Sequence, residues 1–145
     1  MPMIDSLTEE QLQAAANAAA QGPAFRQALW PHCNYVGRDV GPERLKTRIH
    51  PGDQMLLHSL KHFHEVNKPL SQYFNVALQQ HHAAQQILRH FFPNPPDTLK
   101  VLDFACGYGR LLRFLSLSIP PENIWAAEIQ AEAVNFVVSE YGVNG

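Results

Sequence analysis

One stretch of the sequence, VLDFACGYGRLLRFL (residues 101–115), constrains the fold more than any other. It begins with an apolar run that is typical of a strand buried on both faces, and it ends in a leucine-rich helical pattern. Between the two lie small residues with Gly107 and Gly109, which permit backbone conformations that a side chain would block. The stretch therefore predicts a strand, a turn of small residues and a helix in direct succession.

The same order repeats in the residues that follow. We expect a second buried strand over residues 123–129 and a second helix over residues 130–142, with Pro120 and Pro121 closing the first helix. Strand, helix, strand and helix in alternation indicate a parallel sheet with right-handed crossovers. Parallel sheets bind ligands at the carboxyl ends of their strands, which is where the glycine turn lies.

The first part of the chain has the periodicity of helices. A capping pattern at Ser6 and Glu9, with a second one at Thr8 and Gln11, precedes an alanine-rich helix that ends at Gly22.

Further along, residues 30–52 are rich in proline and glycine and are expected to form a loop. Asp53 is predicted to cap a helix that runs to about residue 67, and Pro69 to begin a longer helix that reaches Phe91.

Composition and charge restrict the classes of function. The chain has 145 residues, of which 46% are hydrophobic and 17% charged, as expected for a globular domain with a core. The formal net charge of −2 does not indicate a nucleic acid or an anionic membrane as a partner. We find no secretory signal and no apolar run near the roughly 20 residues that span a bilayer. With Cys33 and Cys106 expected to stay reduced, we expect a cytoplasmic protein.

An acid lies near the end of each predicted strand. Asp103 is in the first strand, and Glu128 follows Gly109 by about 20 residues, the offset at which an acid meets ribose hydroxyls in nucleotide-binding βαβ units. A carboxylate only accepts hydrogen bonds and two vicinal hydroxyls donate two, so a bidentate pair is natural. A dinucleotide is disfavoured because its fingerprint needs a small residue where Leu112 stands.

These features also have purely structural interpretations. The glycine turn is also compatible with a tight connection in an unrelated α/β protein. Glu128 could be a solvent-facing acid at the start of a helix, and Asp103 could cap the backbone of its own turn. For Tyr108, stacking on a ligand and packing on the sheet edge are equally compatible with the sequence. The spacing between Gly109 and Glu128 favours the ligand interpretation.

Residues 103–109 (DFACGYG) resemble the first motif of class I S-adenosylmethionine-dependent methyltransferases, acid-x-Gly-x-Gly-x-Gly. Ala105 stands in place of the first glycine, and Glu128 matches the acid at the end of the family's second strand. This resemblance covers residues 99 to about 142. A looser resemblance, carried by IHPGDQMLL and QYFNVAL, links the first half to the leader of a bacterial group of methyltransferase-domain proteins.

The resemblance implies an α/β fold: a helical N-terminal leader over residues 1–98, then the first βαβα half of a Rossmann-like doubly wound sheet over residues 99–145. It implies that the turn cradles the methionine part of S-adenosylmethionine, that Glu128 holds its ribose and that Asp103 acts near its amino group. The cofactor-binding residues that it implies are Asp103, Ala105, Cys106, Gly107, Tyr108, Gly109, Glu128 and Ile129.

The family's fold has seven strands, and residues 99–145 account for two, so we expect the chain to be the N-terminal part of a longer protein. The methyl acceptor is unknown, and no catalytic base is assigned. Two alternatives remain open: a non-catalytic module that dimerises through uncovered strand edges, and an NAD(P)-dependent oxidoreductase. For the isolated chain we expect a homo-oligomer.

The eight histidines raise the question of a metal site. His58 and His62 have the four-residue spacing of a ligand pair, with His64 nearby and His81 and His82 on a later helix. The second histidine of a metalloprotease motif is missing. A polar helix face is therefore the favoured interpretation, and no metal ligand is assigned.

Overall fold

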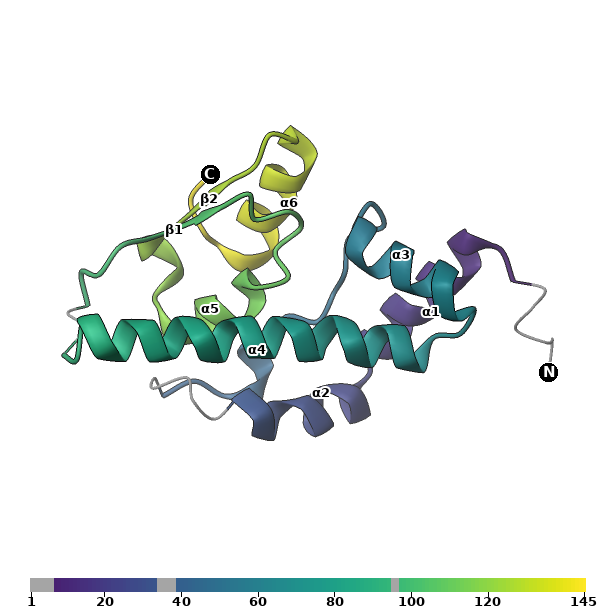
Figure 1. Ribbon diagram of the computed structural model, residues 1–145, viewed down its shortest axis with the longest axis horizontal. Helices are drawn as coiled ribbons and strands as arrows, with labels where there is room; N and C mark the ends of the chain where they lie inside the picture. Colours follow the sequence, from purple (N-terminus) through teal and green to yellow (C-terminus); the bar gives the residue numbers. More distant parts are fainter. Residues whose placement is uncertain (1–6, 34–38, 95–96) are drawn as a thin grey trace.

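A long helix, α4, runs along most of the molecule (Figure 1). The computed structural model describes residues 7–33, 39–94 and 97–145. Its helices and strands in chain order are α1 (Glu9–Gln21), α2 (Pro23–Leu29), α3 (Gln54–Phe63), α4 (Asn67–Phe91), β1 (Val101–Phe104), α5 (Leu112–Ser118), β2 (Ile124–Ala127) and α6 (Ala131–Tyr141), with short 3₁₀ helices at Trp30–Cys33, Pro42–Arg44 and Pro121–Asn123. None of the helices in these ranges combines the length and the apolar character that crossing a bilayer requires.

Local sequence signals determine where the N-terminal helices begin. Thr8 and Gln11 form the second of the two expected capping boxes, with each side chain accepting a hydrogen bond from the other residue's backbone N–H. Ser6, which belongs to the other capping pattern, lies outside the described residues. Asp53 caps α3 as predicted, because its carboxylate accepts from the Met55 N–H at 3.1 Å.

Four helix boundaries differ from the prediction. α4 begins at Asn67, so Pro69 lies at its third position rather than its first. α3 ends earlier than expected, at Phe63, because His64 takes a left-handed conformation with a φ of 51°. A short helix, α2, follows α1 directly, because Pro23 suits the first turn of a new helix as well as the end of the previous one. α5 begins only at Leu112, because the residues before it continue the turn that starts after β1.

The alternation of strand and helix correctly predicted a parallel sheet. β1 and β2 pair in parallel along their whole length, from Val101 opposite Ile124 to Phe104 opposite Ala127. After α6 the chain returns to the other edge of β2, where Asn144 forms a parallel bridge with Trp125. The backbone of Asn144 therefore extends the sheet beyond β2.

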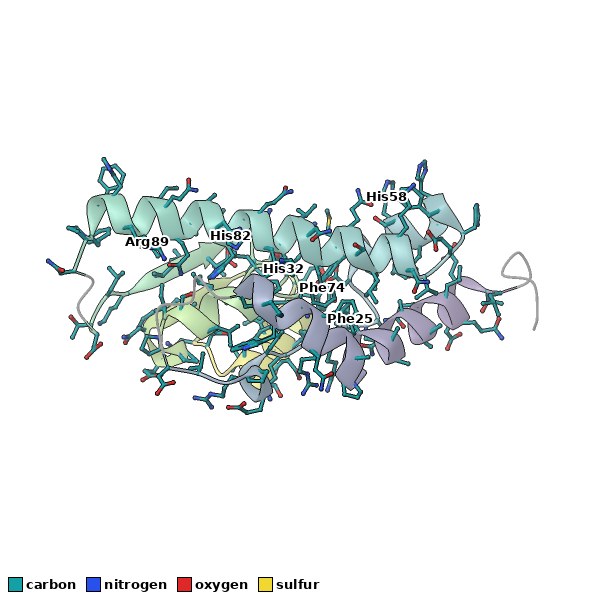
Figure 2. All side chains as sticks on the ribbon, turned by 90° about the horizontal axis from the view of Figure 1, so that it is seen from below. Phe25, His32, His58, Phe74, His82 and Arg89 are labelled. Carbon is teal, nitrogen blue, oxygen red and sulfur yellow. The ribbon has the colours of Figure 1, made fainter. Side chains whose placement is uncertain are left out.

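Two apolar clusters share α5. Its residues Phe114 and Leu117 belong to the cluster formed by the N-terminal helices, and Leu112 and Leu115 belong to the cluster under the sheet. In the first cluster, Phe25 of α2 faces Phe74 of α4, with ring centroids 5.0 Å apart (Figure 2). Both clusters therefore take residues from the same short helix, and Leu88 of α4 also packs against the cluster under the sheet.

In the described part of the chain, one face of the sheet is not covered by a helix. Because successive strand residues point to opposite faces, Ile124 and Ala126 are buried against the helices, whereas their neighbours point away. On the other face, Leu102, Phe104 and Trp125 have exposed fractions of 60%, 80% and 36%. Within the described ranges this apolar face is open to solvent.

A fully buried arginine on α5 joins the helical half to the sheet. The Arg113 guanidinium donates to the backbone carbonyls of Lys46 at 3.3 Å and Arg48 at 3.2 Å, and to Tyr73 Oη at 3.1 Å. Tyr73 in turn donates to Asp53 Oδ2 at 2.6 Å. A buried charge is tolerated only when it is paired and hydrogen-bonded, so this network fixes the segment between Lys46 and Asp53 against α4 and α5.

The protonation states of this network follow from its surroundings. Burial disfavours the charged form of Arg113, but the nearby Tyr141, Tyr73 and Asp53 side chains outweigh it and raise the pKa. Burial raises the pKa of Tyr73, with a smaller contribution from Asp53. The arginine therefore stays charged, and the tyrosine keeps the proton that it donates to Asp53.

We predict that Tyr73→Phe lowers the free energy of unfolding by about 1.5–3 kcal/mol, because it leaves the buried Arg113 and Asp53 charges each without one partner. Urea unfolding followed by circular dichroism measures this. Tyr141→Phe is the matched control: the Tyr141 hydroxyl is also buried but has no hydrogen-bond partner among the described residues, so its removal should be neutral or stabilising. Equal losses in the two variants would contradict the role of the network.

The contact between α4 and α5 also contains a buried histidine. His81 Nε2 lies 3.2 Å from Ser118 Oγ, and the side chain is fully buried. Burial, together with the smaller effect of His82, lowers the pKa of His81 from 6.5 to about 4. His81 is therefore neutral at pH 7.

Because the unfolded chain binds a proton at His81 more readily than the folded protein does, stability should fall as the pH drops from 6.5 to about 4. We expect His81 to account for a loss of about 3 kcal/mol over this window, and His81→Leu to remove that part of the pH dependence. Unfolding in urea at pH 7 and pH 4 measures it for both proteins. The same pH dependence in wild type and variant would contradict the prediction.

Candidate functional site

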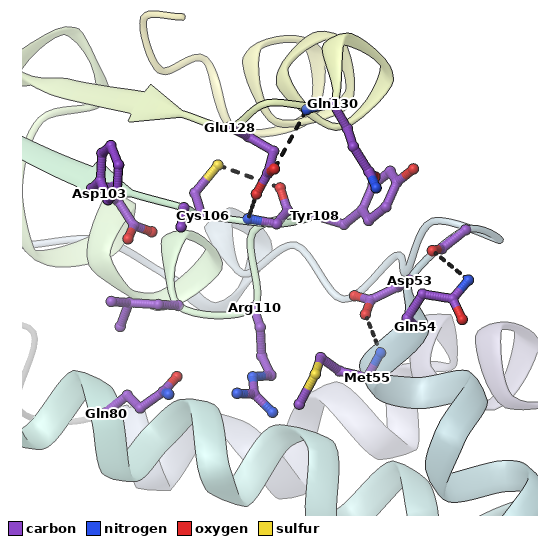
Figure 3. Close-up of a pocket in the computed structure, with 15 residues that line it drawn as sticks. Asp53, Gln54, Met55, Gln80, Asp103, Cys106, Tyr108, Arg110, Glu128 and Gln130 are labelled. Atoms are coloured by element: carbon purple, nitrogen blue, oxygen red, sulfur yellow. Dashed lines mark hydrogen bonds between the residues drawn. The ribbon is translucent and has the colours of Figure 1, made fainter.

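A cavity of about 570 Å³ lies at the carboxyl ends of the two strands (Figure 3). Four parts of the chain enclose it: the stretch from the end of β1 to α5, the residues after β2, the start of α3, and α4. The lining consists of residues 103–108, Arg110 and Leu111 of the turn, Glu128 and Gln130 after β2, residues 52–55 around the start of α3, and Gln80 of α4.

Most of the site residues predicted from the sequence line this cavity, namely Asp103, Ala105, Cys106, Gly107, Tyr108 and Glu128. Two of them lie elsewhere. Gly109 is buried against α6, where a Cβ would come within 3.0 Å of Val137 Cγ1 and closer still to the Tyr141 ring. Ile129 is 98% exposed. Gly109 is therefore required for packing against α6, and Ile129 contributes its backbone rather than its side chain.

The turn has left-handed backbone conformation at three positions: φ is 58° at Ala105, 56° at Gly107 and 82° at Gly109. An L-residue with a side chain is disfavoured in this conformation by about 1–2 kcal/mol. A Cβ added at Gly107 would meet no atom within 4 Å, so space is open beside its Cα. Ala105, which departs from the glycine pattern, nevertheless has the backbone conformation of a glycine.

Glu128 connects the turn to the loop after β2. Its Oε2 accepts from the Gly107 N–H at 3.0 Å, and its Oε1 accepts from the Gln130 N–H at 3.4 Å (Figure 3). Oε1 also accepts from the Ile129 N–H at 2.8 Å. A carboxylate has roughly four acceptor sites, so Oε2 can accept a further hydrogen bond. Glu128 thus fixes the turn and also presents an acceptor to the cavity.

Two further ionisable groups near the end of β1, Asp103 and Cys106, have raised pKa values. Burial raises the pKa of Asp103, whose carboxyl group has no hydrogen-bond partner among the described residues. Burial, with smaller effects of Asp103 and Glu128, raises the pKa of Cys106 to about 11, and its thiol lies 3.3 Å from the Gly107 carbonyl. A protonated thiol is a poor nucleophile, so Cys106 serves as a small packing residue.

His50 holds the segment before α3 against the turn. Its ring stacks on Tyr108, with centroids 4.3 Å and planes 10° apart, and Tyr108 also packs against Phe136 in the cluster under the sheet. His50 Nδ1 accepts from the Gly52 N–H at 2.9 Å. The proton of the neutral ring is therefore on Nε2, which lies 3.4 Å from Glu132 Oε1.

Several lining residues were not predicted from the sequence. Asp53, Gln54 and Met55 come from the start of α3, Gln80 comes from α4, and Arg110 directly follows Gly109. Periodicity cannot show which residues distant in the chain meet in space. The only signal for this wall was the looser resemblance of the segment IHPGDQMLL.

The histidines and cysteines do not converge on a second site. In the ranges that the structure describes, no three His, Cys, Asp or Glu side chains are grouped closely enough to hold a metal ion. His81 is buried and belongs to no such group. Cys33 and Cys106 are both free thiols.

Comparisons of the chain with protein-family models, with curated proteins and with solved structures gave no match. What the chain does must therefore follow from the geometry and chemistry of the cavity.

We predict that Ala105→Gly stabilises the protein by about 0.5–1 kcal/mol, because glycine removes the cost of the left-handed conformation while losing more entropy on folding. Thermal and urea unfolding measure the change. Ala131, which is exposed in the first turn of α6, provides the control, since Ala131→Gly should lower stability. Destabilisation by both substitutions would contradict the strained conformation of Ala105.

Proposed function

We propose that the cavity binds S-adenosylmethionine and that the chain is the cofactor-binding part of a class I methyltransferase with a Rossmann-like fold. One observation carries the proposal: a glycine turn and an acid, at the carboxyl ends of adjacent parallel strands, meet in the wall of one cavity. The Gly107 N–H and Glu128 Oε2 are 3.0 Å apart there. Ligands of open α/β sheets bind at this edge.

The residues present fit an adenosyl ligand with an amino-acid end. The volume of about 570 Å³ is within the usual range of small-molecule sites. The open space beside Gly107 allows a ligand to approach the backbone closely. Glu128 Oε2 can accept a hydrogen bond from a ribose hydroxyl, and the Asp103 carboxyl group is available to an amino group.

When bound, the sulfonium group supplies a methyl group for in-line displacement by a nucleophile. The residues of the chain bind and orient this group, and such positioning contributes much of the catalysis in two-substrate reactions. A general base is needed only if the nucleophile carries a proton, and no histidine is among the described lining residues. We therefore assign cofactor binding to this site and leave the methyl acceptor unassigned.

A dinucleotide is less well supported. Its fingerprint needs a small residue at the position of Leu112, where the helix must approach the pyrophosphate. Here Leu112 is the first residue of α5 and is fully buried in the cluster under the sheet. This leucine contributes to the core and leaves no gap of the kind that a dinucleotide requires.

We predict that Glu128→Ala weakens the binding of S-adenosylhomocysteine about tenfold to a hundredfold, since it removes charge-assisted hydrogen bonds to the ribose. Titration calorimetry measures the affinity. Glu10→Ala, an exposed acid on α1, is the matched control and should leave the affinity unchanged. Gly107→Val should abolish binding, because its side chain would fill the open space and strain the left-handed backbone.

Two results would count against this assignment. Tight binding of NAD without any response to S-adenosylmethionine or S-adenosylhomocysteine would overturn the proposed function. Unchanged adenosyl affinity in Glu128→Ala would retain the ligand but remove the ribose role of Glu128.

A further inference from the structure

A second cavity, of about 250 Å³, lies against the C-terminal half of α4. Its lining among the described residues consists of His82, Gln85, Gln86 and Arg89. At 3.6 residues per turn, Arg89 lies about 180° around α4 from Gln80, which lines the larger cavity. The two cavities are therefore on opposite sides of the same helix.

The lining of this second cavity includes a guanidinium and, in the part of the chain that the structure describes, no acid. α4 has no Asp or Glu in any of its 25 residues, so no acid of the same helix lies beside Arg89. The ion pairs found in the described ranges involve other residues. The Arg89 side chain is thus exposed and has no acid partner in those ranges.

Gln85 is the buried polar side chain of this lining. It is 9% exposed, and its amide forms no hydrogen bond within the described part of the chain. A buried amide without a partner is unfavourable, because it has lost its hydrogen bonds to water. The Nε2 of Gln13 is also unpartnered but is fully enclosed, whereas Gln85 lines a cavity from which an acceptor can reach its amide.

The side chains of this lining share one face of α4. Gln85 and Arg89 are four residues apart, which makes them neighbours on the helix surface. Figure 2 shows Arg89 and His82 on the same side of α4, the side on which His32 lies. His82 Nε2 lies 3.4 Å from the His32 carbonyl oxygen, so the 3₁₀ helix Trp30–Cys33 borders the cavity at His82.

We infer that Gln85 and Arg89 form a binding site for a small oxyanion, a carboxylate or a phosphate group, to which the guanidinium and the amide both donate N–H hydrogen bonds. The planar guanidinium presents two donors to such a group, and the amide supplies another. A volume below the usual range of drug-sized sites suits an inorganic anion or the acid group of a small metabolite. This inference does not depend on the proposed function.

The test is an NMR titration of the ¹⁵N-labelled chain with sodium phosphate and with sodium acetate, each compared with sodium chloride at the same ionic strength. Phosphate or acetate should produce saturable shifts of the Gln85 side-chain amide, with a dissociation constant in the millimolar range expected for an ion of few atoms. The more tightly bound of the two identifies the preferred acid group.

Variants test the two donors separately. Arg89→Gln should weaken the more tightly bound anion at least about tenfold, because it removes charge-assisted hydrogen bonds. Gln85→Leu should weaken it about threefold to tenfold without lowering stability in urea, since the folded protein loses no described hydrogen bond. Arg44→Gln and Gln79→Leu, at exposed positions outside the cavity, are the matched controls and should leave the affinity unchanged.

Two results would overturn the oxyanion site. The first is a set of shifts with phosphate and acetate that match those with chloride, which needs no variant to be observed. The second is equal affinity of Arg89→Gln and Arg44→Gln for the more tightly bound anion. Neither result bears on the adenosyl ligand, whose proposed cavity lies on the opposite side of α4.

Discussion

The buried charge of Arg113 is the constraint on which the rest of the structure depends. Arg113 lies on α5, which follows directly from the glycine turn, and it reaches backbone carbonyls of the segment before α3 and the hydroxyl of Tyr73 on α4. Because a buried charge needs hydrogen-bond partners, and two of these are carbonyls of this segment, the segment is held beside the turn. Asp53, at the end of the same network, both caps α3 and lines the cavity. The far wall of the site is thus positioned by a residue outside it.

The elements that could be predicted are those with local signals. The capping box at Thr8, the cap at Asp53 and the apolar run before Gly107 each act within a few residues, and the structure has a helix or a strand at each. The alternation of strand and helix was sufficient to predict the parallel pairing. The start of α2 at Pro23 was not predictable, because proline is found both after the end of a helix and in its first turn. The early end of α3 was not predictable either, because the sequence has no clear signal for a left-handed conformation at His64.

Only the wall of the cavity that the glycine turn and the residues after β2 form could be predicted from the sequence. Residues from Asp103 to Tyr108 and Glu128 are close in space because two parallel strands end side by side, which is a local rule of the fold. The opposite wall, with Gln54 and Gln80, depends on how α3 and α4 pack, and no pattern in the chain encodes that. The self-association expected from uncovered strand edges remains a prediction.

The central claim is that an adenosyl ligand binds between the glycine turn and the start of α3. The most direct measurement is a titration of the ¹⁵N-labelled chain with S-adenosylhomocysteine, followed by amide chemical shifts in NMR spectra. The account predicts the largest changes at Gly107 and Gln130 on one wall, and at Gln54 and Met55 on the other. Changes confined to the distant polar surface of α4 around Arg89, or the absence of any change at saturating ligand, would contradict it.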